Sequence, residues 1–282
     1  MGQKTVLKES IMLKIGIIGC GTIGTCICKA IDDGLMEAEV YAIYDRNAEN
    51  VERLQSSLVN LQPAVMEAEE MIKHIDLLVE CASQEAVYEV VPAALHARCD
   101  VMIMSVGAFA DERLFKTVYG IAKEMNCKIY LPSGAIAGLD GLKSAASEQI
   151  YSVTLTTQKP PAGLAGAPYV VQNKIKLDEI KSKTVIFEGK ASEAVKGFPA
   201  NVNVAATLSL AGTGFEKTKV KIIANPALCR NIHEITVEGA FGKLTSKVEN
   251  VPSPNNPKSS YLAPLSAIAT LKKIIDPLQI GT

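Results

Sequence analysis

The segment from Leu13 to Ile31 constrains the fold of this chain more than any other part of the sequence. It starts with a short apolar run rich in β-branched residues, which predicts a strand, and ends in a proline-free apolar stretch, which predicts a helix. Between them, Gly19, Gly21 and Gly24 permit a tight turn, close approach of the backbone to a pyrophosphate, and close strand–helix packing. The helix N-terminus adds free N–H groups and a partial positive charge. We therefore predict that a dinucleotide binds at Gly19, Cys20, Gly21, Thr22, Ile23 and Gly24.

A second predicted strand, Glu39–Tyr44, ends in Asp45, 21 residues after Gly24. An acidic residue about 20 residues beyond the glycine pattern is where such folds hold the hydroxyl groups of the adenosine ribose. The Asp45 carboxylate would repel the 2′-phosphate of NADP, whereas the guanidinium of Arg46 beside it could pair with that phosphate. The expected cofactor is NAD or NADP, with NAD preferred and NADP tolerated.

Composition and charge exclude several functional classes. The net charge is −1 and the pI is near 6.3, so nothing indicates binding to nucleic acid or to an anionic membrane. No run reaches 18 apolar residues, and no signal peptide is visible. The seven cysteines lie mostly in apolar runs without the paired spacing of a metal site, which indicates reduced thiols in a cytoplasmic protein that binds no metal. Residues 1–12 are expected to be an N-terminal extension.

Helical and strand patterns alternate along the first half of the chain. After Asp45 the predicted elements are Ala48–Leu58, Ile75–Cys81, Gln84–Ala97, Asp100–Ser105, Glu112–Met125 and Lys128–Leu131. This alternation predicts βαβ units and a parallel sheet, and the continuous apolar strands indicate burial on both faces.

The pattern changes near residue 133 to segments in which apolar and polar residues alternate. The strands predicted there are Ser152–Thr157, Thr184–Glu188, Thr218–Ala224 and Ile232–Val237, and the helices are Leu139–Glu148 and Asn201–Ala211. A last apolar helix, Tyr261–Ile275, could not bury its apolar face alone and is expected to return to the first domain. We thus predict an α/β protein with a Rossmann dinucleotide-binding domain, 13–132 plus about 250–282, and an α+β, mostly antiparallel substrate domain, 133–249.

Ligands of open α/β sheets bind at the carboxyl ends of the strands. At these positions the sequence has small or polar residues, and those predicted to contact the cofactor are Ala82, Ser83, Ser105 and Val106. Small residues also make tight strand-to-helix turns, and the pattern alone leaves both interpretations open.

Three histidines are available for acid–base chemistry. His74 and His96 lie in polar surroundings and read as solvated surface residues. In the strand pattern around His233, alternation puts its side chain on the buried face with Ile235 and Val237. A histidine there is either a hydrogen-bonded core residue or a group that faces the cofactor, and the pattern does not decide between them.

The motifs of the whole chain, taken in order, resemble those of the L-aspartate dehydrogenases of archaea and bacteria. The motifs that carry this resemblance are Gly19-x-Gly21-Thr22-Ile23-Gly24, Glu80-Cys81-Ala82-Ser83, Ser105-Val106-Gly107-Ala108, Pro132 to Asp140, Lys159-Pro160-Pro161, Phe198 to Ala206 and Asn231-Ile232-His233-Glu234. The resemblance implies NAD or NADP as oxidant and a single catalytic histidine, which matches His233. It also implies cofactor contacts at Ala137 and Asn203, and Asn201 lies too close to Asn203 to be separated from it without an alignment.

The implied reaction is the oxidative deamination of L-aspartate to iminoaspartate, or to oxaloacetate and ammonia, in support of NAD biosynthesis. A neutral histidine could take a proton from the substrate ammonium or from the water that attacks the imine. A dicarboxylic amino acid needs cationic or N–H donors, for which Lys159, Arg230 and Lys258, together with Asn201, are the candidates.

The sequence is also compatible with two other functions. One is a related two-domain NAD(P)-dependent reductase, similar to dihydrodipicolinate reductase or to homoserine dehydrogenase. The other is a dinucleotide-sensing protein without turnover. We also expect a homodimer or another homo-oligomer.

Overall fold

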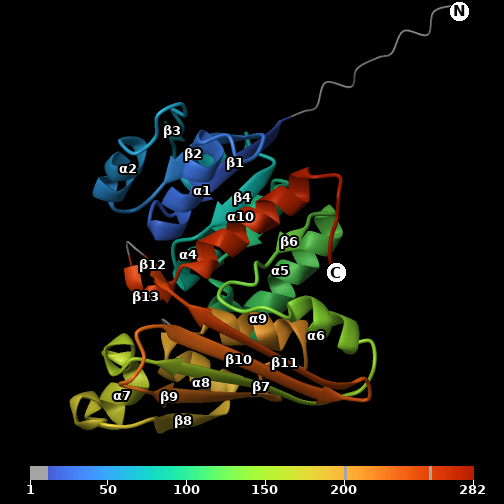
Figure 1. The fold of residues 1–282 in the computed structure, drawn as a ribbon. Helices are drawn as coiled ribbons and strands as arrows, with labels where there is room; N and C mark the ends of the chain where they lie inside the picture. Colours follow the sequence, from blue (N-terminus) through green and yellow to red (C-terminus); the bar gives the residue numbers. More distant parts are fainter. Residues whose placement is uncertain (1–11, 200–201, 254–255) are drawn as a thin grey trace, which may run out of the picture.

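The computed structural model describes residues 12–199, 202–253 and 256–282. It contains a six-stranded and a five-stranded sheet, one above the other in Figure 1, and a two-stranded sheet that lies between them. Asn201 and residues 1–11, for which we made predictions from the sequence, lie outside the described residues.

The six-stranded sheet is parallel throughout, with the order β3-β2-β1-β4-β5-β6. Its strands are β1 (Leu13–Ile18), β2 (Ala38–Tyr44), β3 (Ala64–Val65), β4 (Leu77–Glu80), β5 (Asp100–Ile103) and β6 (Ile129–Tyr130). This is the strand order of a Rossmann fold, and the predicted fold class is confirmed. The sequence did not predict β3, because two exposed residues carry no periodicity.

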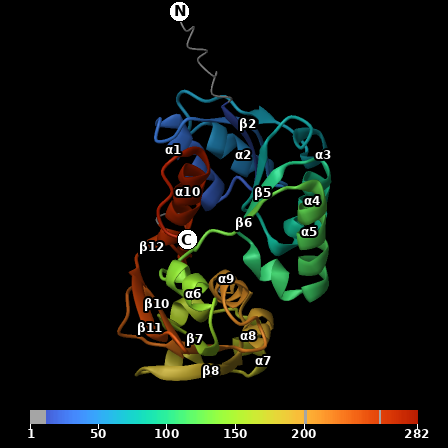
Figure 2. The same cartoon turned by 90° about the vertical axis from the view of Figure 1, so that its right-hand side faces the viewer.

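Helices cover both faces of the parallel sheet (Figure 2). The apolar side chains of α1 (Thr22–Asp32), α2 (Ala48–Gln55) and the last helix, α10 (Leu262–Ile275), are buried against one face. Those of α3 (Ala68–Met71), α4 (Gln84–His96) and α5 (Glu112–Met125) are buried against the other. Because α10 packs beside α1, the predicted return of the C-terminal helix is confirmed.

The five-stranded sheet has the order β11-β10-β7-β9-β8. Its strands are β7 (Ile150–Lys159), β8 (Thr184–Lys190), β9 (Thr218–Ala224), β10 (Asn231–Gly239) and β11 (Gly242–Asn250). Three of its strand pairs are antiparallel, but β7 and β9 are parallel, since the long connection between them allows a crossover. The sequence did not predict β11, because its exposed positions are polar and its inward ones only half-buried.

Short helices accompany this mixed sheet. They are α6 (Leu139–Ala145), α7 (Pro168–Gln172), α8 (Ala191–Gly197) and α9 (Asn203–Ala211), with 3-10 turns η2 (Pro161–Leu164) and η3 (Leu177–Glu179). A further 3-10 turn, η1 (Val106–Ala110), follows β5 and packs in the core of the parallel sheet. Apolar residues of α6, α8 and α9 join those of β7 and β10 in one core. The small sheet pairs β12 (Pro252–Ser253) with β13 (Asn256–Ser260), which leads directly into α10.

The inward face of the mixed sheet changes character along β7 and β10. At one end it carries Leu155 opposite Ile235, both in the apolar core. One step further along it carries Thr157 opposite His233, and then Lys159 at the end of β7, all of them buried. Since polar groups are buried only where they have partners or a function, this end of the face marks a candidate site.

Candidate active site

The glycine turn between β1 and α1 has the close contacts that the sequence predicted. Gly19 has a φ of +105°, and a β-carbon there would lie 2.7 Å from the Cys81 backbone. A β-carbon on Gly24 would lie within van der Waals distance of the Gly19 carbonyl oxygen, so only glycine lets α1 approach β1 this closely. A β-carbon on Gly21 would have nothing within 4 Å among the described residues, which leaves space in front of the helix N-terminus.

A cavity opens beside this turn, and we call it the glycine-loop cavity. Its lining comes from the glycine turn, the end of β2, the loop after β4 and the start of α4, and includes Gly19, Gly21, Asp45, Arg46, Ala82, Ser83 and Glu89. The Asp45 carboxylate accepts hydrogen bonds from the Cys20 amide (2.8 Å), the Asn47 amide (2.8 Å) and the Asn50 side chain (3.2 Å). Asp45 is therefore fixed to the glycine turn, at the edge where the sequence predicted the adenosine ribose.

The loops that follow β4 and β5 are joined by a buried carboxylate. Glu80, at the end of β4, accepts hydrogen bonds from the Ala82 and Ser83 amides and from both the amide and the hydroxyl of Ser105, at 2.8–3.0 Å. Burial raises the pKa of Glu80, and the four hydrogen bonds oppose that effect. Ser105 thus faces Glu80 rather than a cavity, whereas its neighbour Val106 lines the second cavity.

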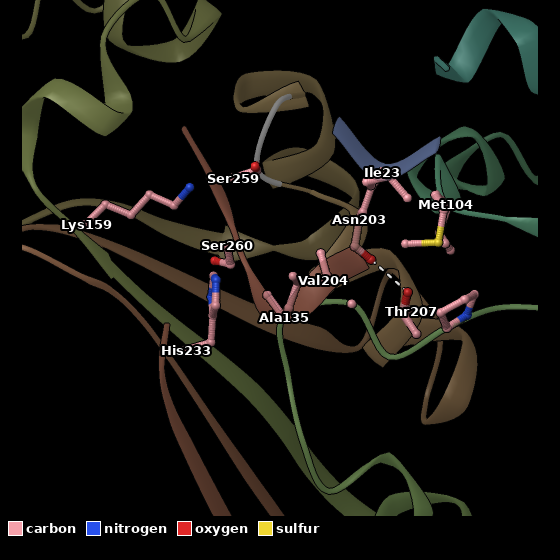
Figure 3. Close-up of a pocket in the computed structure, with 14 residues that line it drawn as sticks. Ile23, Met104, Ala135, Lys159, Asn203, Val204, Thr207, His233, Ser259 and Ser260 are labelled. Carbon is pink, nitrogen blue, oxygen red and sulfur yellow. Dashed lines mark hydrogen bonds between the residues drawn. The ribbon is translucent and has the colours of Figure 1, made fainter. Parts of the chain in front are cut away.

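The second cavity lies between the two large sheets, and we call it the inter-sheet cavity. Its lining residues are Ile23, Met104, Val106, Pro132, Gly134, Ala135, Lys159, Asn203, Val204, Thr207, His233, Ser259, Ser260 and Ala263. Figure 3 shows Lys159 and His233 on one side of it and Asn203, Thr207 and Met104 on the other. Because Ile23 belongs to α1 and Met104 and Val106 follow β5, this cavity adjoins the glycine turn.

His233 is buried, and its ring nitrogen Nδ1 lies 3.0 Å from the Thr157 hydroxyl on the neighbouring strand. Its pKa is lowered to about 3, first because burial disfavours the imidazolium and second because of the positive charge of Lys159. The imidazole is therefore neutral at physiological pH. With Nδ1 engaged by Thr157, Nε2 is the nitrogen that can exchange a proton with a bound molecule.

Lys159 is the cation of the inter-sheet cavity. Its side chain is only 4% exposed, and burial lowers its pKa to about 8. The ammonium group is thus mostly charged at neutral pH but loses its proton more easily than a surface lysine. A cation in such a cavity is suited to hold a carboxylate.

Asn203, at the start of α9, links the two halves of the site. Its side-chain oxygen accepts a hydrogen bond of 3.0 Å from the Gly107 amide in the turn after β5. A β-carbon on Gly107 would lie 2.6 Å from the Gln84 side-chain nitrogen and 2.9 Å from a Val202 methyl group, so a larger residue would force these side chains to shift. The predicted cofactor residue therefore lines the cavity and also ties the second sheet to the first.

The described predicted residues that line neither cavity are Cys20, Thr22 and Gly24 of the glycine turn, Ser105, Ala137 and Arg230. Ala137 is exposed and lines neither, although Gly134 and Ala135 of the same loop line the inter-sheet cavity. Arg230 is exposed in the turn before β10, where its charge contributes to lowering the pKa of Glu249. Asn201 and the Lys258 side chain are outside the described part of the chain.

Sequence reasoning did not find several residues that the fold brings into the site. Thr157 contacts His233 across 76 positions of sequence, so only the strand register brings them together. Ser259 and Ser260 reach the cavity from β13, a segment without a periodic signal. The sequence indicated Glu80 only as part of a motif. Its position, a single acidic residue at the end of an apolar strand, was the one signal that it could join two loops.

The described residues contain no group of three or more His, Cys, Asp or Glu side chains that could hold a metal ion. Across the same ranges, no helix is both long and apolar enough to span a bilayer.

Two family models match the chain. Residues 140–274 match the model described as aspartate dehydrogenase, C-terminal, and residues 19–132 match the NAD binding domain of homoserine dehydrogenase. Among curated proteins, the L-aspartate dehydrogenase of Methanococcoides burtonii is 69% identical over 271 residues, 96% of this chain and all of that protein. The L-aspartate dehydrogenase of Nitrosopumilus maritimus is 47% identical over 274 residues, with the same coverage.

Solved structures give the same result. The crystal structure of aspartate dehydrogenase from Thermotoga maritima superimposes with a TM-score of 0.74 at 32% identity, over 95% of this chain and 99% of that one. A homoserine dehydrogenase from Thiobacillus denitrificans superimposes with a TM-score of 0.61 at 14% identity, over 93% of this chain and 73% of that one, which indicates a shared fold alone.

Proposed function

The chain belongs to the aspartate dehydrogenase family, and from this membership we propose that it oxidises L-aspartate with NAD or NADP. The observation that carries the proposal is the pairing, in one cavity beside the glycine turn, of a neutral buried histidine with a buried lysine. The proposed products are iminoaspartate and the reduced cofactor, followed by oxaloacetate and ammonia.

The residues around the glycine turn fit a dinucleotide. The N-terminus of α1 has no side-chain cap, so its first N–H groups can hold the pyrophosphate. Asp45 would accept hydrogen bonds from the adenosine ribose in the glycine-loop cavity, with Arg46, Ala82 and Ser83 beside it. The nicotinamide half would extend past Ile23 and Val106 into the inter-sheet cavity, toward Asn203.

His233 is the proposed proton acceptor. NAD or NADP, when bound, would supply the hydride acceptor for the oxidation of the aspartate α-carbon to an imine carbon. The substrate ammonium must first lose a proton, because only a nitrogen with a lone pair can form the C=N bond. His233 accepts this proton at Nε2 while Nδ1 donates to the Thr157 hydroxyl. Once that proton has left to solvent, the neutral imidazole can take a proton from the water that adds to the iminium carbon and pass it to the departing ammonia.

Lys159 is the proposed partner of a substrate carboxylate. Pairing with a carboxylate would neutralise the positive charge that helps to lower the pKa of His233. The imidazole then becomes a stronger base when a dicarboxylate is bound than when the site is open. Substrate binding and proton acceptance are thus coupled in this site. Arg230 and Asn201 remain secondary candidates for substrate contacts.

We further propose the two-domain division, 13–132 with about 250–282 and 133–249, since the chain passes between the two large sheets near residues 132 and 250. We propose a cytoplasmic location, which is supported by seven free cysteines. A homo-oligomer and a role in supplying NAD biosynthesis are also part of the proposal, the second because iminoaspartate is a precursor of quinolinate.

An absorbance screen at 340 nm tests the proposed reaction. Purified protein should reduce NAD or NADP with L-aspartate, and should oxidise NADH with oxaloacetate and ammonia. L-Alanine should be inert, because it lacks the second carboxylate by which a site for a dicarboxylic amino acid recognises aspartate. Turnover of a monocarboxylate or a hydroxy acid in place of aspartate would contradict the proposal, and binding of NADH without any turnover would favour a dinucleotide sensor.

A further inference from the structure

Arg46, the residue that could bind the 2′-phosphate of NADP, is held by two carboxylates from α4. One guanidinium nitrogen lies 2.9 Å from Glu85 Oε2, and the other lies 2.6 and 2.5 Å from the two oxygens of Glu89. Glu85 and Glu89 are four positions apart and so lie on one face of the helix. The guanidinium is therefore engaged before any cofactor arrives.

Arg46, Glu85 and Glu89 lie beside the residue that is expected to hold the adenosine ribose. Arg46 directly follows Asp45, and both residues line the glycine-loop cavity together with Glu89. Arg46 and Glu89 also line a neighbouring cavity, whose other charged residues are Glu67 and Glu69. A phosphate on the ribose that Asp45 holds would thus enter surroundings in which carboxylates outnumber guanidinium groups.

Glu85 and Glu89 together engage the two terminal nitrogens of the guanidinium, one carboxylate on each, and this is an edge that a phosphate would use. Arginine binds a phosphate through two parallel N–H groups, in the same geometry that it uses for a carboxylate. A 2′-phosphate that binds this edge must displace both carboxylates; otherwise Arg46 stays in place and the phosphate lies close to negative charges. The hydroxyl of NAD meets neither obstacle, since it can donate a hydrogen bond to Asp45.

We propose that Glu85 and Glu89 are specificity-determining residues, which favour NAD over NADP by holding Arg46 away from the 2′-phosphate. The inference rests on the proposed function only in placing the adenosine ribose at Asp45. The three side chains are about half to two-thirds exposed, so the ion pairs contribute little to stability and their removal should leave the fold intact.

The test is the double substitution Glu85→Gln with Glu89→Gln in the full chain. Dissociation constants for NADH and NADPH are measured by fluorescence titration, and their ratio is compared with that of the unsubstituted protein. We expect the ratio to shift toward NADPH on the order of tenfold, since Arg46 is released and two negative charges are lost. Adding Arg46→Ala to the double variant should abolish most of the gain.

Salt gives a second readout of the same inference. In the unsubstituted protein, higher ionic strength screens repulsion of the 2′-phosphate and should improve NADPH binding relative to NADH. In the double variant the dominant effect is attraction to Arg46, so higher salt should worsen the ratio. The pyrophosphate is common to both ligands and cancels.

Glu112→Gln is the matched control, because Glu112 forms a similar exposed ion pair with Lys116 on α5. It should leave the ratio unchanged. An unchanged ratio in the double variant, or a gain that survives Arg46→Ala, would overturn the inference. Binding of both dinucleotides without oxidation of aspartate would instead contradict the proposed function, so the two failures are distinguishable.

Discussion

The chemistry of this site depends on two residues that burial has shifted away from their ordinary protonation behaviour. His233 has a pKa lowered to about 3, by burial and by the charge of Lys159, and burial lowers the pKa of Lys159 to about 8. The pKa of each side chain therefore depends on the charge of the molecule that binds beside it.

Replacing His233 with alanine should lower kcat about 10²- to 10⁴-fold, because the substrate ammonium loses its proton acceptor. The affinity for NADH should remain nearly unchanged, since His233 lies on the mixed sheet and not at the glycine turn. Steady-state kinetics and NADH titration measure the two effects. His96→Ala, on the exposed end of α4, is the control and should stay within a few-fold of the unsubstituted rate. Full activity of His233→Ala would show that His233 is a core residue and not the proton acceptor.

The pH dependence of dicarboxylate binding should report Lys159. Its ammonium is charged below a pKa of about 8 and neutral above it, so binding of an anion weakens as the pH rises through that value. Succinate, which has no amine of its own, is the suitable probe, and its dissociation constant should rise roughly tenfold per pH unit above 8. Lys159→Arg should keep the binding constant over the same range, and Lys159→Met should bind succinate weakly at every pH. A flat profile in the unsubstituted protein would exclude Lys159 as the carboxylate partner.

Among the elements, the loops after β4 and β5 are joined by one buried side chain. Glu80 accepts four hydrogen bonds, two from each loop, and these loops reach both cavities through Ala82, Ser83 and Val106. The carboxylate thereby sets the spacing of the loops along which a dinucleotide would lie.

Glu80→Gln should therefore weaken both stability and cofactor binding. The amide keeps the size of the side chain but points N–H donors at neighbouring N–H or O–H donors, which leaves buried groups unsatisfied at a cost of about 1–3 kcal/mol in the free energy of unfolding. Urea denaturation and NADH titration measure the two effects. Glu85→Gln, whose side chain is exposed on α4, is the matched control for stability and should change the free energy of unfolding by less than about 0.5 kcal/mol. A stable Glu80→Gln protein with normal NADH affinity would show that the loops hold their spacing without it.

Local signals predicted the elements well where one short pattern contains the whole element. The predicted helix Glu112–Met125 matches α5, and the glycine turn with Asp45 is as expected, because turn, cap and periodicity are all local. The resemblance to aspartate dehydrogenases is also confirmed. The contacts of Thr157 with His233 and of Glu85 with Arg46 could not be predicted, since they depend on strand register and on packing between distant elements. Parallel pairing of β7 with β9 was missed for the same reason.

The whole molecule holds its site between two sheets that several hydrogen bonds connect. The Gly134 amide donates to the Ser266 hydroxyl on α10, and the Asn250 side chain donates to the Ala135 carbonyl, both at 3.0 Å. Asn203 makes the corresponding link to Gly107 on the other side of the cavity. Hydrogen bonds thus hold the cavity walls on two sides. The helix α10 takes part in one of these bonds and also packs against the parallel sheet.

Stability should depend strongly on how α10 packs. Leu271 is fully buried in the core beside α1, so Leu271→Ala should lower the free energy of unfolding by about 2–5 kcal/mol. Leu265 lies on the same helix but is 41% exposed, and Leu265→Ala should change stability by less than about 1 kcal/mol. Urea denaturation of the two variants gives the comparison, and equal effects would contradict the packing described for this helix.

The position of α10 at the end of the chain also determines when one face of the parallel sheet can be covered during synthesis. All six of its strands have been made by residue 130, but the helix that covers the surface beside α1 ends at residue 275. That apolar surface therefore emerges from the ribosome early and remains open while the mixed sheet is being translated. The half of the molecule that is made first is the half that finishes folding last.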